Sequence, residues 1–201
     1  MISNPSQRFA VRRPRALRAG FTLVELLTVI AIVVILAALS VGIFNFATKK
    51  GETAKAQTQM TLLDNAVQKY HAEVGVFPEG TGDGSPEESL ILYSMAFGDG
   101  LGEDGVANTD DDEAYDGIPD PGATVHVPEM DPNESKSPWF ESNDIPPNAL
   151  LDPWGLPWRY RNGDDPNAIN PDFDLWSSGP DGLSRPDDPQ HPENKDDIGN
   201  W

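Results

Sequence analysis

The sequence predicts an α+β fold, in which one long N-terminal α-helix packs on a small antiparallel β-sheet with long loops. Three observations predict it. Residues 21–47 form an apolar run, residues 56–74 repeat apolar side chains at helical spacing, and the Gly- and Pro-rich remainder holds two short alternating segments. With 201 residues, the chain has room for one ordinary domain plus an appendage.

The apolar run has the length of a membrane-spanning helix. As a helix, residues 21–47 would be roughly 40 Å long at ~1.5 Å per residue, and a bilayer's hydrocarbon core is ~30 Å thick. Basic residues precede the run and an acidic domain follows it, which predicts a cytoplasmic N-terminus and a single pass. The basic residues are Arg8, Arg12, Arg13, Arg15 and Arg18.

Glu25 is the residue in this run that needs an explanation. A carboxylate at that depth costs about 2.5–3.5 kcal/mol on insertion scales. A secretory signal peptide is not expected, because the run is too long and no small-x-small cleavage site follows it. A plain membrane anchor fits everything except Glu25.

A second helical pattern continues the first. Six apolar residues recur at spacings of four, three, four, three and four, which indicates one buried helix face. They are Ala56, Met60, Leu63, Val67, Tyr70 and Val74. Gly75 and Pro78 end the pattern. We therefore expect one helix from about Phe21 to Val74, amphipathic in its upper half, with Gly42 or Gly51 as the candidate points for a bend.

The remainder of the chain is rich in turn residues and holds three short patterned segments. Residues 89–98, SLILYSMAFG, are consistent with a short helix. Trp158 and Tyr160 alternate with arginines, and Phe173 and Leu175 flank an aspartate. This alternation predicts two strands joined across residues 162–163.

Composition excludes several classes of function. Without residues 1–20 the chain has 9 basic and 33 acidic residues, a surface that repels nucleic acids and suits cations. The absence of cysteine excludes disulfides, thiolate metal sites and a cysteine nucleophile. His71, His126 and His191 are not spaced as metal ligands, and no HExxH, GxSxG or glycine-rich phosphate loop occurs. An enzyme is not expected.

The segment from Gly20 to Glu25, GFTLVE, followed by an apolar helix, resembles the prepilin signature of type IV pilins and type II secretion pseudopilins. The resemblance implies that a prepilin peptidase cuts between Gly20 and Phe21 and methylates the Phe21 nitrogen. It divides the chain into a cleaved leader at 1–20, a membrane and filament-core helix at 21–47, and a periplasmic globular domain at 48–201. That domain would carry an acidic insertion at about 80–150.

This resemblance also suggests a role for Glu25. In a filament of packed helices, the Phe21 amine would be a cation among apolar neighbours. A carboxylate on a neighbouring helix can pair with it, and such a pair favours the one register that satisfies both charges. The alternative is an acid without a role in an ordinary anchor.

Three later segments resemble the C-terminal half of the type II major pseudopilin. They are DPWGLPW at 152–158, FDLWSSGPDG at 173–182 and DIGNW at 197–201. In that family a loop between the last strands binds one calcium ion, which takes six to eight oxygen ligands.

Carried over by position, the resemblance implies a set of calcium ligands. Asp181 is the first candidate, with the carbonyls of Ser178 and Leu183 beside it. Asp187 and Asp188 are the next acids, and Asp196 and Asp197 are the alternates. The alternative interpretation is a solvated acidic tail, although Ile198 and Trp201 offer an apolar anchor. The tract at 104–120 lacks EF-hand spacing and predicts a flexible acidic loop, with a second calcium site as the alternative.

Together these features predict a major pseudopilin that polymerises into a periplasmic pseudopilus and drives export of folded proteins from the bacterial inner membrane. Besides other copies of itself, the implied partners are minor pseudopilins, a platform protein, an assembly ATPase and the prepilin peptidase. A type IV or competence pilin is one alternative, although those more often carry a C-terminal cysteine pair. A monomeric, membrane-anchored calcium-binding protein is the other, and it would not need Glu25.

Overall fold

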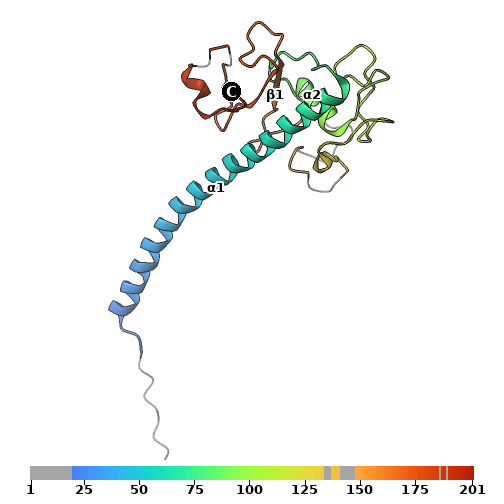
Figure 1. Cartoon of the computed structure of the whole chain (residues 1–201). Coiled ribbons are helices and arrows are strands. Elements are labelled where there is room, and N and C mark those ends of the chain that lie inside the picture. The colour runs from blue at the N-terminus through green and yellow to red at the C-terminus, as the bar shows by residue number, and fades with distance from the viewer. Residues whose placement is uncertain (1–19, 134–136, 141–147, 186, 189) are drawn as a thin grey trace, which may run out of the picture. The chain divides into compact units, whose positions relative to one another are not determined.

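The computed structural model describes residues 20–133, 137–140, 148–185, 187–188 and 190–201, with the side chains of residues 41–43 and 45 outside the description. The chain divides into two compact units, Met1–Phe46 and Ala47–Trp201, and one helix, α1, Leu23–Val74, belongs to both (Figure 1). The α+β class predicted from the sequence is confirmed: the long apolar helix is followed by a short helix and a three-stranded antiparallel sheet.

In the first unit, α1 presents apolar side chains outward all round. Among the described residues, Leu23–Ser40 is the one helical segment long and apolar enough to cross a membrane, with a mean hydropathy of 2.8. None of this segment is buried within the chain. Leu26, Ile30 and Val33 are each more than half exposed, so this surface needs lipid or other helices to cover it. The helix remains helical at both Gly42 and Gly51.

In the second unit, the predicted stripe of α1 forms one wall of the core. Ala56, Leu63 and Val67 are fully buried, and Tyr70 is nearly so. Val74 differs from the prediction because it is 36% exposed. The helix ends there, at Gly75 with φ +91°, where the Gly75 N–H donates to the His71 carbonyl, and no later turn covers Val74.

The short helix α2, Pro86–Phe97, begins three residues before the predicted segment. Ser85 accounts for the earlier start, because its hydroxyl accepts the Glu88 N–H and Pro86 fits the first helical turn. Gly98, with φ 79°, ends the helix in the left-handed conformation. Every residue from Ser89 to Phe97 is buried, so α2 is a central core element.

Three antiparallel strands form the sheet, in the order β1-β2-β3. The predicted pair is present as β1, Arg159–Asn162, and β2, Phe173–Ser177, with Tyr160 opposite Leu175. The third strand, β3, Ile198–Gly199, was not predicted. It pairs with the end of β2, and Asn200 extends the contact by donating its backbone N–H to the Leu175 carbonyl over 3.1 Å.

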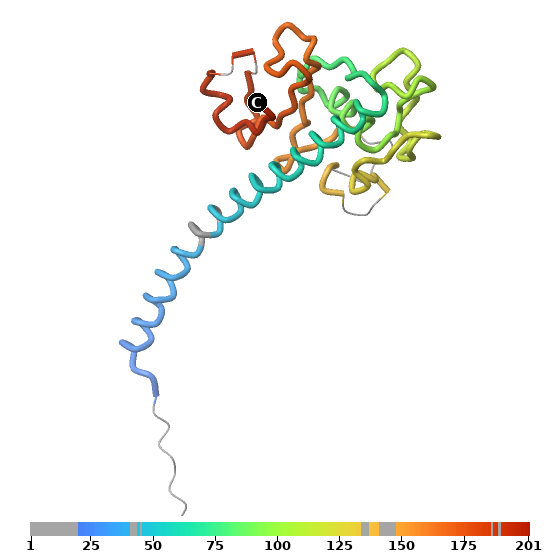
Figure 2. Tube along the Cα trace, in the orientation of Figure 1, coloured from blue at the N-terminus to red at the C-terminus, as the bar shows by residue number. Residues whose placement is uncertain are grey.

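The segment predicted to be an acidic insertion, residues 80–150, contributes to the core. Leu101, Ala107, Met130, Trp139 and Leu150 are buried in the same cluster as α1, α2 and the sheet. The trace in Figure 2 places the loops of residues 100–130 and the C-terminal residues 176–201 on opposite sides of the second unit. Two 3-10 turns, Pro128–Met130 and Pro192–Asp196, lie in these regions.

Tyr70 ties the acidic tract to α1. Its hydroxyl donates to the Gly105 carbonyl over 2.8 Å and accepts the Ala107 N–H over 3.0 Å. The first residues of the tract at 104–120 are therefore held against the helix, whereas the sequence predicts a flexible loop for the whole tract. The apolar residues Leu101 and Ala107 within and beside the acidic sequence account for the difference, because burying them draws the loop inward.

The buried His126 should make the second unit less stable in mild acid. Burial lowers the pKa of His126 below 6.5, Glu73 opposes the shift and Lys69 adds to it. As the pH falls through 6.5, the unfolded chain therefore takes up the proton first, and stability declines. We expect the melting temperature of His126→Gln to fall less between pH 7 and pH 5 than that of the wild type. Equal slopes would contradict this. The comparison with the wild type is needed because Asp99, Asp152 and Asp197 have raised pKa values, that of Asp197 about 6, and these act in the opposite direction.

Candidate functional site

The predicted processing site lies in exposed, non-helical backbone. Residues 20–22 precede α1, and Phe21 is 87% exposed. A Cβ placed on Gly20 would meet no atom of the described residues within 4 Å, so their fold does not require glycine there. The Gly20–Phe21 bond is accessible to a peptidase, and a larger residue at position 20 would fit the chain.

Glu25 is part of a capping box at the start of α1. The Thr22 hydroxyl accepts the Glu25 N–H over 3.2 Å. In return the Glu25 carboxylate accepts the Thr22 N–H and the Thr22 hydroxyl, each over 2.8 Å. This reciprocal pattern satisfies two N–H groups that a helix otherwise leaves unpaired. Glu25 therefore has a role within a single chain, besides the pairing between subunits that the sequence suggests.

The C-terminal loop begins with a tight turn after β2. Gly179 has a φ of 66°, and a Cβ on it would lie 2.4 Å from the Asp196 carbonyl oxygen, so only glycine allows this approach. The Asp181 N–H then donates to the Asp196 carboxylate over 3.4 Å. The Asp181 carboxylate accepts the Leu183 N–H over 2.8 Å. The turn thus brings Asp181 beside Asp196, 15 residues later in the chain.

Asp197 is the most unusual carboxylate of this loop. Its Oδ2 accepts the Ser184 hydroxyl over 2.6 Å, and its Oδ1 is buried without a hydrogen-bond partner among the described residues. Burial, with smaller contributions from the Asp196 and Asp181 carboxylates, raises the pKa of Asp197 to about 6, while the Ser184 hydrogen bond and the Arg159 charge oppose the shift. The three acids are therefore close enough to repel one another, and one buried oxygen has no protein donor.

The structure thus brings some of the predicted ligands together and not others. Asp181, Asp196 and Asp197 form one group, here named the carboxylate cluster. Asp187 and Asp188 are exposed, and no contact joins them to this cluster among the described residues. Ser178 is buried beside the turn, and Leu183 is half exposed. Within the described residues no three acidic or histidine side chains already converge as a metal site, and the Asp181 carboxylate faces its own Leu183 N–H.

Asp152, to which the sequence pattern assigns no role, positions this loop. Its Oδ1 accepts the N–H groups of Trp154 and Leu156, each over 2.9 Å, and so holds the DPWG turn. Its Oδ2 accepts the Ser177 hydroxyl, and that hydroxyl accepts the Gly179 N–H over 3.1 Å. Burial raises the pKa of Asp152, and the Ser177 hydrogen bond opposes the shift. The turn therefore fixes the chain where the carboxylate cluster begins.

These observations define a class of protein. An apolar helix able to cross a membrane continues into the second unit, which is α+β, and this is a pilin-like fold. Residues 15–41 match the family model for the prokaryotic N-terminal methylation motif. This motif is the prepilin signature of type IV pilin-like proteins, which are structural subunits that a prepilin peptidase processes and that assemble into filaments. None of the curated protein sequences compared with the chain matches it.

Proposed function

We propose that the chain is the major pseudopilin subunit of a type II secretion system. The carboxylate cluster carries this proposal, because it lies in the loop between the last two strands where the resemblance implies a calcium ion. The matched motif at residues 15–41 supports the broader class, a pilin-like subunit of a filament. The finer assignment rests on the loop and on the DPWG and DIGNW segments that hold it.

The carboxylate cluster offers the type of donor atom that calcium binds. All three side chains offer hard oxygen donors, which calcium prefers. The unpartnered Asp197 Oδ1 is a buried acceptor that a cation would satisfy, and a positive charge would relieve the repulsion among the acids. Asp181, Asp196 and Asp197 would hold the ion, together with main-chain carbonyls of the turn. The ion would join the turn after β2 to the end of the chain, where no disulfide is available.

In this function the exposed apolar surface of α1 drives assembly. Once helices of neighbouring subunits pack together, residues such as Leu26 and Ile30 exchange lipid for protein contacts. Repeated identical contacts that do not close into a ring produce an open helical filament. Growth of that filament from an inner-membrane platform, powered by an assembly ATPase, would push folded proteins toward the outer membrane.

Changing Gly20 should block processing without changing the fold of the second unit. For Gly20→Val we expect the precursor to accumulate uncut and Phe21 to remain unmethylated, both measured by mass spectrometry of the membrane fraction. The melting temperature of the second unit should not change, because no atom of the described residues lies within 4 Å of a Cβ at this position. Normal cleavage of the variant would show that the peptidase does not read this position.

Secretion and piliation assays separate the two filament systems. The chain is expressed in bacteria that lack their own major pseudopilin, and separately in bacteria that lack their own major pilin. We expect it to restore export of a folded enzyme in the first strain and to give no surface pili in the second. Restoration of pili alone would assign the chain to a type IV or competence pilus.

One observation favours a second candidate, a monomeric anchored calcium-binding protein. The capping box gives Glu25 a partner within its own chain, so the carboxylate does not require a neighbouring subunit. In that case the carboxylate cluster would still bind calcium, but no filament would form. Chemical crosslinking of the full chain in membranes distinguishes the two, because a monomer gives no ladder of oligomers.

A further inference from the structure

A cavity of about 340 Å³ opens at the C-terminal end of α1. Its walls come from the end of α1, from α2 and from the acidic insertion. Four carboxylates line it, and we name the site the acidic pocket: Glu73, Glu103, Asp104 and Asp120. Among the lining residues in the described part of the chain none is lysine or arginine, but His126 lines the cavity, with its imidazole 3.7 Å from the Glu73 carboxylate, and Lys69 of α1 lies near enough to His126 to lower its pKa.

The acidic pocket is built to attract a cation. The last carbonyls of α1 point toward this end of the helix, and they add the negative pole of the helix dipole at Val74. His126 has a side chain only 5% exposed, and burial keeps it from supplying a compensating positive charge. Two of these carboxylates accept backbone N–H groups: Asp104 accepts that of Val106 and Asp120 that of Leu101.

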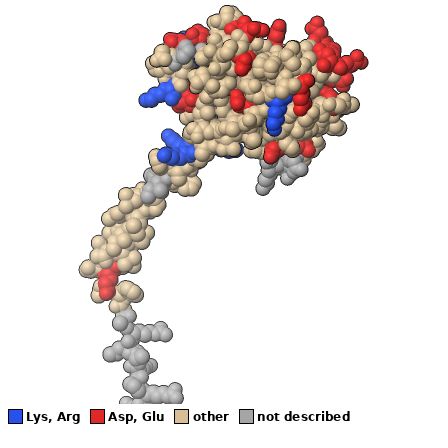
Figure 3. Space-filling model, in the orientation of Figure 1, with Lys and Arg blue, Asp and Glu red and all other residues tan. Residues whose placement is uncertain are grey.

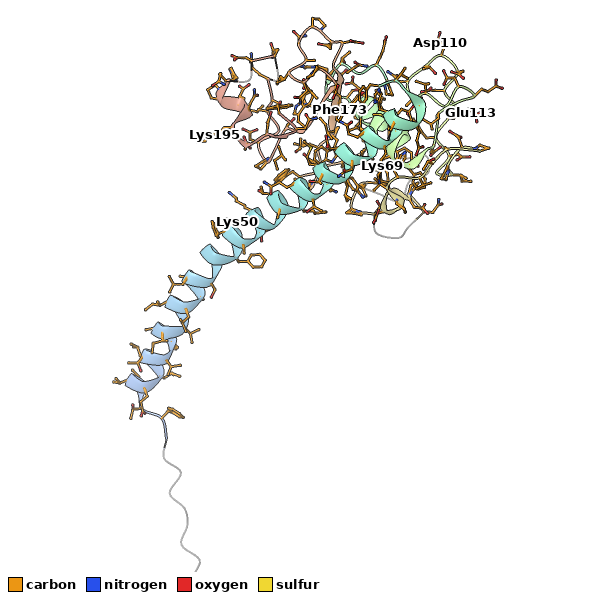
Figure 4. All side chains as sticks on the ribbon, viewed as in Figure 1. Lys50, Lys69, Asp110, Glu113, Phe173 and Lys195 are labelled. Atoms are coloured by element: carbon orange, nitrogen blue, oxygen red, sulfur yellow. The ribbon has the colours of Figure 1, made fainter. Side chains whose placement is uncertain are left out.

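Exposed lysines lie near residue 50 of α1, far along the helix from the acidic pocket at its C-terminal end. Lys49, Lys50 and Lys55, here named the basic cluster, are exposed within seven residues of α1 where the second unit begins, and the one acid among them is the half-buried Glu52. Figure 3 shows blue side chains there, further blue groups elsewhere on the unit, and red ones scattered over its surface. In Figure 4, Lys50 lies at this end, while Asp110 and Glu113 of the acidic insertion lie at the opposite side of the unit.

Helix geometry separates the two features within one chain. From Lys50 to Val74, α1 advances about 36 Å at 1.5 Å per residue. The basic cluster therefore cannot reach the acidic pocket of its own chain. Two complementary sites at opposite ends of one rigid element join copies head to tail, and such a contact repeats without closing.

We propose that the basic cluster of one copy docks into the acidic pocket of a second copy, offset by about 36 Å along the helix. This inference rests on the proposed filament and names a contact between its head units. Charge complementarity selects the second copy as the occupant, because the chain carries both halves of the pair. The contact sets the relative orientation of neighbouring copies as well as attracting them. Two basic clusters repel each other, and so do two acidic pockets, so only unlike sites pair.

Crosslinking tests the contact, and the absence of native cysteine removes any background. The full chain is prepared with both Lys55→Cys and Asp104→Cys, allowed to assemble in membranes, and treated with a short bismaleimide. We expect a ladder of dimers, trimers and higher oligomers. A mixture of the two single variants should stop at dimers, because each copy then holds one thiol. As a matched control, Lys195→Cys with Asp104→Cys should give no ladder, since Lys195 is an exposed lysine outside the basic cluster.

Charge reversal gives an independent measurement. Changing all three lysines to glutamate should lower filament yield about tenfold, because like charges would then face one another. Adding Glu103→Lys and Asp104→Lys should restore most of that yield. Filaments that assemble normally but give no ladder and ignore the reversal would overturn this contact while leaving the proposed function intact. Crosslinking of the pocket thiol to other proteins only would overturn it as well. Loss of wild-type filaments altogether would instead contradict the proposed function.

Discussion

Replacing calcium with excess chelator is expected to lower the midpoint of thermal unfolding of residues 47–201 by about 5–10 °C. A ligand present at 100 times its dissociation constant stabilises a fold by about 2.7 kcal/mol. For a unit of this size, each kcal/mol changes the midpoint by about 2–4 °C. Scanning calorimetry with calcium and then with chelator measures the difference. Identical melts would exclude a structural calcium ion in this unit.

One conservative substitution, Asp197→Asn, should lower the melting temperature relative to the wild type in calcium but not in chelator. Asp197→Asn keeps the shape of the side chain and an oxygen to accept the Ser184 hydroxyl, but it removes a charge. In chelator we expect the variant to melt at the same temperature as the wild type or higher, because a buried charge beside Asp196 and Asp181 has been removed. In calcium we expect it to melt lower, because a ligand has been lost. A purely structural Asp197 would lower the midpoint in both conditions.

A matched control separates the two predicted ligand sets. Asp187→Asn and Asp188→Asn remove charge from exposed positions that have no contact with the carboxylate cluster among the described residues. If Asp181, Asp196 and Asp197 hold the ion, this double variant should respond to calcium as the wild type does. A lost response would restore Asp187 and Asp188 as ligands and would require the loop to rearrange on binding.

The long helix and the first two strands could be predicted because their signals are local. The stripe from Ala56 to Val74 follows the 3.6-residue period over several turns, and all of its members except Val74 are buried. Likewise, the alternation around Tyr160 and Leu175 indicates a strand without reference to the rest of the chain. The burial of Val74 depends on the path of the chain beyond Gly75, and the periodicity of the helix does not contain that information.

The C-terminal site was less predictable because it depends on distant contacts. β3 has only two residues, and it is a strand because β2 pairs with it. That pairing brings Asp196 and Asp197 back to the turn at Asp181, whereas sequence order alone places Asp187 and Asp188 nearer. The capping box was different, since the Thr22–Glu25 spacing is its known signature and could have been recognised from the sequence.

This capping box makes Glu25→Gln the most informative change in the chain. Glutamine at the same position of a capping box still accepts the Thr22 N–H, but it carries no charge. If Glu25 pairs with the Phe21 amine of a neighbouring subunit, the variant leaves that cation unpaired among apolar helices, at a cost of about 3–5 kcal/mol per contact. We therefore expect filament assembly of Glu25→Gln, and of Glu25→Ala, to fall more than tenfold.

The matched control is Thr22→Val, which removes the hydroxyl of the cap and keeps the carboxylate. We expect this variant to assemble almost as well as the wild type, because the lost cap costs only about 1 kcal/mol. Membrane insertion should persist in all three variants, since the two Glu25 variants remove a charge from the apolar segment, which makes insertion easier, and Thr22→Val removes only a hydroxyl. Yields of sheared filaments and of membrane-bound chain measure the two steps separately. If Glu25→Gln assembles and Thr22→Val does not, then the carboxylate serves its own helix, and the register of the filament is set by other contacts.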